Sequence, residues 1–118
     1  MINGFHAILY SEDAEADRAF FRDVLKFGHI DAGEGWLIFA MPPTESGIHP
    51  ADGHAAGMAG KHEVYLMCDD IHATMKEPQG RGAKFKGEPS DQGWGVVAAI
   101  VLPGGSELGI YQPRHPRP

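Results

Sequence analysis

The sequence has only one cysteine, Cys68, among its 118 residues. A single cysteine can form neither an internal disulfide nor a multi-cysteine zinc site, so we expect the chain to work in a reducing compartment, the cytoplasm. Basic residues are also scarce, since 10 Lys and Arg stand against 16 Asp and Glu and the formal net charge is -6. Because no basic cluster is present, nucleic acid is not an expected partner.

Long apolar runs are missing as well. The longest, Val96–Leu102, is far shorter than the roughly 18 residues that a membrane span requires, so no membrane association is expected. The first six residues show no basic region followed by an apolar stretch, so we expect no secretory signal. A hydrophobic content of 42% is ordinary for one globular domain of this length.

Two segments have helical periodicity. Between Ala14 and Lys26, apolar residues recur at intervals of four, Asp13 is suited to cap the first turn, and Gly28 ends the segment. A second helix is expected to begin at Ile71, although Pro78 weakens it. Apolar segments bounded by turn residues predict strands over residues 5–10, 36–41, 63–68, 83–87, 94–102 and 106–112, and a weaker strand over residues 44–49.

These elements form an internal repeat. Residues 6–13 align with residues 63–70, and residues 44–49 align with residues 106–111 with identical Glu, Gly and Ile at three of the six positions. The chain is therefore expected to contain two copies of a strand–helix–three-strand unit. The expected boundaries are module one over residues 1–50, a Gly-rich linker over residues 51–60, module two over residues 61–113, and a mobile tail over residues 114–118.

With this repeat, the chain resembles the vicinal-oxygen-chelate superfamily, which includes glyoxalase I, bleomycin-resistance proteins and extradiol dioxygenases. The resemblance covers residues 5–113 and is most specific in residues 16–25, 62–71 and 102–113. It implies an α+β fold in which two βαβββ modules form an open eight-stranded cup around a small-molecule site. It also implies a homodimer, and we expect one because apolar residues such as Phe39, Ile100 and Leu102 would be left partly uncovered in one chain.

The resemblance places metal ligands on the first and last strands of each module. These positions carry His6 and Glu63, but the other two carry Gly47 and Gly109, which have no ligating side chain. Strand alternation offers Glu107 as a replacement, giving the set His6, Glu63 and Glu107 for one Zn, Mn, Ni or Fe ion. However, two residues along a strand span about 6.6 Å, whereas metal–oxygen bonds are about 2.0–2.2 Å long. We therefore expect a degenerate metal site.

The cup is expected to bind a ligand through a small set of side chains: His6, Tyr10, Tyr65, Met67, Glu107 and Tyr111. Glu63 is the candidate catalytic residue, because a carboxylate in an apolar strand requires a partner or a raised pKa. Alternative interpretations remain for two members of the site. His6 is as well explained as a core histidine, and Glu107 as a charge at the rim of the sheet.

Two functions are compatible with these residues. The first is a protein that binds a small oxygenated or aromatic compound in the cup without a metal ion, as bleomycin-resistance relatives do. The alternative is a divalent-metal-dependent lyase, isomerase or dioxygenase that uses His6, Glu63 and Glu107. The sequence leaves open whether the protein is an enzyme.

Overall fold

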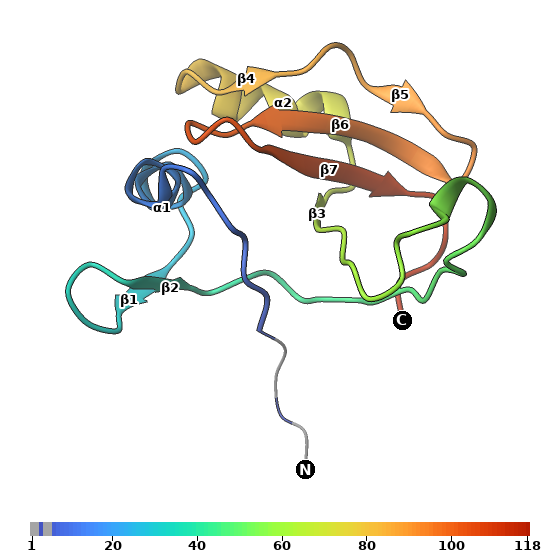
Figure 1. Ribbon diagram of the computed structural model, residues 1–118. Coiled ribbons are helices and arrows are strands. Elements are labelled where there is room, and N and C mark those ends of the chain that lie inside the picture. The colour runs from blue at the N-terminus through green and yellow to red at the C-terminus, as the bar shows by residue number, and fades with distance from the viewer. Residues whose placement is uncertain (1–2, 4–5) are drawn as a thin grey trace.

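The computed structural model describes residue 3 and residues 6–118 (Figure 1). Along the chain the elements are α1 (Ala14–Asp23), β1 (His29–Asp31), β2 (Leu37–Phe39), the 3-10 helix η1 (Gly53–Ala55), β3 (Tyr65–Met67), α2 (Ile71–Gly80), β4 (Lys84–Phe85), β5 (Ser90–Asp91), β6 (Gly95–Val101) and β7 (Glu107–Pro113). No helix in the described residues has the length and apolar character needed to cross a bilayer.

Five strands form the main sheet, in which β3, β7, β6 and β4 lie side by side and β5 also pairs with β6. The β3–β7 pair is parallel, whereas the pairs made by β6 are antiparallel. Strands β1 and β2 form a separate antiparallel pair, which Figure 1 shows beside α1. Helices and a mixed sheet in this arrangement give the α+β class expected from the sequence.

Both helices begin with the same kind of N-terminal cap, an aspartate side chain. The Asp13 side chain accepts a hydrogen bond of 3.1 Å from the backbone N–H of Ala16, and the Asp70 side chain accepts one of the same length from Ala73. In each case an aspartate satisfies an N–H that the first helical turn leaves without a partner. The matching caps are consistent with the internal repeat in which residues 13 and 70 align.

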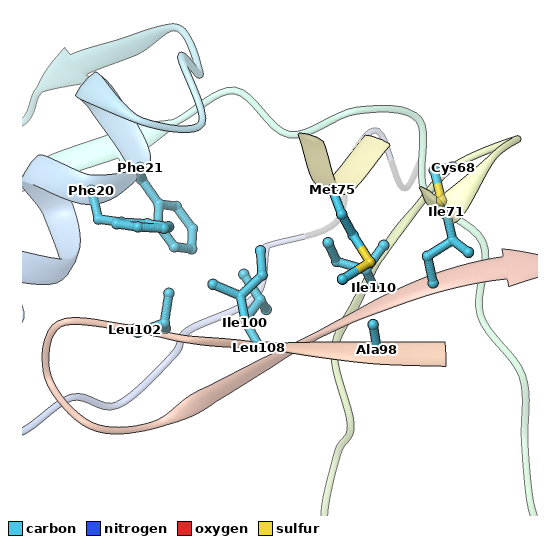
Figure 2. Packing of buried hydrophobic residues seen from close by; sticks show 10 residues of the cluster. All are labelled: Phe20, Phe21, Cys68, Ile71, Met75, Ala98, Ile100, Leu102, Leu108 and Ile110. Atoms are coloured by element: carbon cyan, nitrogen blue, oxygen red, sulfur yellow. The ribbon is translucent and has the colours of Figure 1, made fainter. Parts of the chain in front are cut away.

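One face of the main sheet is covered by both helices. Figure 2 shows Ile71 and Met75 of α2 over one end of this face, and Phe20 and Phe21 of α1 over the other. The buried sheet residues between them are Ala98, Ile100, Leu102, Leu108 and Ile110. Module one therefore contributes α1 to the core that module two builds.

This packing corrects one expectation from the sequence. Ile100 is 0% exposed and Leu102 is 4% exposed, so neither is left uncovered in a single chain, and half-buried Phe39 packs against the same core. The reason is that α1 crosses from module one to cover these strands. Their burial removes the argument that these three residues require a second chain.

Two expected strands of module one are also absent. Residues 6–10 and 44–49 contain no strand, and Phe5 lies outside the described residues. A strand forms only where a neighbouring edge supplies hydrogen-bond partners, and the prolines at 42, 43 and 50 beside the second segment have no N–H to donate. The module instead forms β1, which was not predicted from the sequence, paired with β2. The eight-stranded cup is therefore not complete within one chain.

The tail over residues 114–118 contains no helix or strand, but its side chains contact the rest of the chain. Arg114 pairs with Asp91 at 2.6 Å, and His115 Nε2 lies 3.1 Å from Glu45 Oε2. A weaker contact of 3.5 Å joins Arg117 to Asp69. The tail thus contacts both modules.

Candidate functional site

The register of the sheet places several candidate residues on the face opposite the helices. Tyr65 on β3 pairs with Gly109 on β7, which in turn pairs with Ala99 on β6. Residues that pair directly across strands point to the same face. Two residues further along the strands, Met67, Tyr111 and Val97 are aligned in the same way.

A pocket of about 490 Å³ lies on this face. Its lining includes Glu63, Tyr65, Lys86, Glu88, Glu107 and Gly109. The sequence-predicted residues Glu63, Tyr65 and Glu107 are therefore brought together. Lys86 and Glu88 were not predicted from the sequence, although their spacing of two residues is the signal that would have placed both on one face.

Glu63, Lys86 and Glu107 each have a partner within the pocket. The Tyr65 hydroxyl donates to Glu63 Oε2 at 3.4 Å, and Lys86 Nζ lies 3.1 Å from Glu107 Oε1. Burial raises the pKa of the Tyr65 hydroxyl, and the negative charge of Glu63 raises it further. The phenol is therefore a hydrogen-bond donor at neutral pH. Glu63 itself is exposed, so it is not the buried carboxylate expected from the sequence.

Aromatic rings lie directly over two glycines of the sheet. A Cβ atom added to Gly109 would lie 2.6 Å from Tyr65 Cε1 and closer still to Cδ1. A Cβ atom added to Gly95 would lie 2.8 Å from the Gln112 carbonyl oxygen and closer to the Tyr111 ring. Both distances are below van der Waals contact, so each ring fits only because the residue beneath it has no side chain.

Tyr65, Tyr111 and Trp94 form what we call the aromatic row. The ring centroids of Tyr65 and Tyr111 are 5.9 Å apart, and those of Tyr111 and Trp94 are 5.4 Å apart. These spacings are typical of edge-to-face aromatic pairs. Tyr65 is 40% exposed and Trp94 is 54% exposed, so the row borders solvent and does not belong to the core.

The remaining candidates lie elsewhere. Tyr10 is 88% exposed and lines a second depression of about 380 Å³ with Ser11, Gly104 and Gly105. His6 is exposed and does not line the pocket on the sheet. The structure therefore does not bring His6 and Tyr10 together with Glu63 and Tyr65 in a single chain.

The donor set does not fit a divalent ion in one chain. Among the residues that the structure describes, no group of three or more His, Cys, Asp or Glu side chains is placed to hold a metal. His6 is not beside Glu63 and Glu107, and the Tyr65 ring occupies the space that a ligating side chain at position 109 would need. The set His6, Glu63 and Glu107 is thus not assembled.

Cys68 has no place in this site. Its side chain is buried with the core on the opposite face of the sheet, and burial raises the pKa of its thiol. A thiol with a raised pKa is a poor nucleophile at neutral pH.

A mixed sheet with helices on one face, and with a pocket beside exposed aromatic rings on the other, defines an α+β domain whose second sheet face is open. The family model of the Glyoxalase/Bleomycin resistance protein/Dioxygenase superfamily matches residues 5–110. The chain belongs to this superfamily, which confirms the resemblance seen in the sequence. A search of curated proteins finds no match.

Solved structures share the fold at low sequence identity. TnmS3, an antibiotic binding protein from Streptomyces sp. CB03234, is 22% identical with a TM-score of 0.60, and the match covers 92% of this chain and 99% of that one. Lactoylglutathione lyase from Agrobacterium tumefaciens is 17% identical with a TM-score of 0.59, covering 87% of each chain. UcmS2 is 16% identical with a TM-score of 0.56, covering 86% of this chain and 91% of that one.

Proposed function

We propose that the protein binds a small aromatic or oxygenated compound on the exposed face of the main sheet, without a metal ion. The observation that carries this proposal is the Tyr65 ring seated over Gly109 at the border of the pocket. The ring replaces a side chain on β7 with an aromatic surface. A ligand ring gains stacking or edge-to-face contacts on such a surface, in addition to its burial from water.

The polar groups of the pocket support the same function. Glu63 offers a carboxylate that accepts a hydrogen bond from a ligand hydroxyl or amine, and it is exposed enough to be reached. A few polar groups that orient a ligand on a mainly apolar or aromatic surface are typical of small-molecule sites. The fold shared with an antibiotic binding protein, TnmS3, agrees with this proposal.

We also propose that two chains form a homodimer in the cytoplasm. The repeat aligns residues 6–13 with 63–70 and residues 44–49 with 106–111, and the module-two copies supply the parallel pair β3–β7. The module-one copies form no strand within residues 6–13 and 44–49, and Ile8 and Ile48 are 61% and 96% exposed. A second copy that covers these segments completes the cup that one chain leaves open.

Titration with a planar aromatic probe tests the binding function. In a Trp36→Phe background Trp94 is the only tryptophan, so its fluorescence reports a ligand on the aromatic row. We expect proflavine to quench this fluorescence saturably, and Tyr65→Ala to weaken its binding about tenfold, whereas Ile30→Ala, at an exposed position on the separate β1–β2 pair, leaves it unchanged. No saturable binding of proflavine or of other aromatic and oxygenated compounds would contradict the proposal.

Calorimetry with metal ions tests the proposal that the ligand binds without a metal ion. The wild-type protein, purified without a metal-affinity tag, is titrated with Zn²⁺, Mn²⁺, Ni²⁺ and Fe²⁺ beside Glu63→Gln. We expect no stoichiometric micromolar binding. Such binding by the wild type, lost in Glu63→Gln, would restore the metal-dependent lyase, isomerase or dioxygenase as the function.

A further inference from the structure

Arg114, the residue after β7, is tied to the turn between β5 and β6. Its Nη1 and Nη2 atoms donate to the two carboxylate oxygens of Asp91 at 2.6 Å each, and Nη1 also donates to the Gly93 carbonyl at 2.8 Å. The Gly93 N–H in turn donates to Asp91 Oδ1 at 2.8 Å. We call this set of contacts the Asp91–Arg114 clamp.

Arg114 hydrogen-bonds to the backbone at Trp94 and at the residue before it. The Arg114 N–H donates to the Trp94 carbonyl at 3.3 Å, while the Arg114 side chain holds the Gly93 carbonyl just before it. On the far side of the turn, the Gln92 N–H donates to the Gly95 carbonyl at 2.8 Å. The backbone on either side of Trp94 is therefore fixed to the end of β7, the strand that carries Tyr111.

The position of Trp94 determines how far the aromatic row extends from the pocket. Trp94 does not line the pocket, yet its ring lies 5.4 Å from Tyr111, which links it through Tyr111 to Tyr65 at the pocket edge. The aromatic surface thus continues beyond the pocket along β7. We expect a ligand with a single ring to contact only the Tyr65 end of this row, and a ligand with several fused rings to extend toward Trp94.

We propose that Asp91 and Arg114 are positioning residues that hold Trp94 against Tyr111 and so select extended, fused-ring ligands. This inference rests on the proposed binding function and adds the size of the ligand to it. Neither residue touches the ligand in this scheme. They act through Trp94, whose ring is the outermost member of the aromatic row.

The energetics of the clamp favour an effect on local geometry over one on global stability. Asp91 and Arg114 are both exposed, and exposed ion pairs contribute little to the free energy of unfolding. The bidentate geometry nevertheless defines orientation, because two parallel hydrogen bonds fix the plane of the guanidinium relative to the carboxylate. The Arg114 guanidinium also holds the pKa of Asp91 well below its usual range, so the pair stays charged at neutral pH.

The test uses the Trp36→Phe background and measures acrylamide quenching of Trp94 in the free protein. Arg114→Gln and Asp91→Asn are expected to increase quenching, because the turn that carries Trp94 is released. Arg114→Lys keeps the charge but loses the bidentate pair, and is expected to give an intermediate value. The matched control is Arg117→Gln, which removes another tail arginine with only a single 3.5 Å contact to Asp69.

Binding of two probes then separates positioning from a general loss of structure. Arg114→Gln is expected to weaken binding of proflavine, which has three fused rings, about tenfold, while binding of the single-ring benzylamine stays unchanged. The double variant with Asp91→Arg and Arg114→Asp is expected to recover part of the proflavine affinity. Thermal melting of each variant shows whether it is folded.

Two results would overturn the inference: unchanged Trp94 quenching in Arg114→Gln, or equal loss of affinity for both probes. Failure of the proposed function is a different result, because the wild type would then bind neither probe. In that case Trp94 quenching in the free protein still decides whether the clamp positions this ring.

Discussion

The ring of Tyr65 on β3 covers Gly109, its partner across the parallel β3–β7 pair. The family resemblance predicts a metal-ligating carboxylate at position 109. From the sequence alone, the glycine at this position indicates only that the ligand is missing. The structure adds what takes its place, an aromatic ring whose hydroxyl donates to Glu63. Glycine and tyrosine at these positions therefore depend on each other.

This dependence predicts the effect of Gly109→Ala. The added Cβ would overlap the Tyr65 ring, which must move, so we expect the free energy of unfolding to fall by about 1–3 kcal/mol and proflavine binding to weaken. Urea denaturation measures the first effect and fluorescence titration the second. Gly80→Ala at the end of α2 is the control, because a Cβ added there meets no atom within 4 Å and the position lies outside the proposed dimer contact.

A second variant shows whether the overlap is the cause. Combined with Tyr65→Ala, Gly109→Ala should no longer be destabilising, since the ring that it displaces is gone. A full additive loss in the double variant would show that the glycine is needed for a reason other than the ring.

Glu63→Gln should separate binding from stability. Glu63 is exposed, so we expect the free energy of unfolding to change by less than about 0.5 kcal/mol. Loss of a charged acceptor should weaken binding of an amine-bearing probe such as benzylamine by about 1–3 kcal/mol. Calorimetric titration measures this, with Glu34→Gln, at an exposed position in the β1–β2 turn, as control. Equal affinity in Glu63→Gln and wild type would remove Glu63 from the binding site.

The raised pKa of Tyr65 predicts a change of stability at alkaline pH. Burial and the Glu63 charge raise this pKa above its usual value of 10.0, so the folded state holds the proton more tightly than the unfolded state. The resulting stability is fully present below pH 10 and is lost as the pH rises through the folded-state pKa. Tyr65→Phe should therefore lose less stability than wild type between about pH 9 and pH 11 in urea denaturation.

Helices and long strands were predicted well because their signals are local. Asp13 caps α1 as expected, α2 begins at Ile71 as expected, and the apolar run from Trp94 to Leu102 contains β6. The structure bounds α1 at Asp23, short of the expected Lys26, which adopts a positive φ of 61°. Caps and apolar periodicity depend on residues that are close together in the chain, so they can be recognised in the sequence alone.

The errors concern contacts between distant segments. Residues 5–10 and 44–49 have strand-like composition, but a strand also requires a paired edge, and the structure supplies none to residues 6–10 or 44–49. Likewise, Gly109 and Gly95 were visible as glycines, but which rings lie over them depends on strand register. Period two along β3 and β7 placed Tyr65, Glu107 and Gly109 on one face, because the alternation is local to each strand. The contacts of α1 and of the tail with the rest of the chain could not be predicted, because they join segments that are distant in the sequence.

Asp17 is a buried carboxylate that connects the two modules. It is 9% exposed on α1, and its Oδ1 atom accepts a hydrogen bond of 2.8 Å from the Gly104 N–H in the β6–β7 turn. Asp17→Ala leaves that N–H without its partner, so we expect a loss of about 1–3 kcal/mol in the free energy of unfolding. Asp17→Asn keeps an acceptor and should lose less. Asp23→Ala, which breaks an exposed ion pair with Arg22, should change stability by less than about 1 kcal/mol.

Oligomeric state tests the proposed completion of the cup. At micromolar concentration, light scattering should give twice the 12.8 kDa mass of one chain, because an exposed side chain such as Ile48 gains burial when a second copy covers residues 44–49. A glutamate there would place a charge in the contact, so Ile48→Glu should shift the population to monomer. Ile30→Glu is the matched control, since Ile30 is also exposed, at 67%, but lies on the separate β1–β2 pair. A monomeric wild type would remove the dimer from the proposal, and a dimer that survives Ile48→Glu would place the contact on another surface.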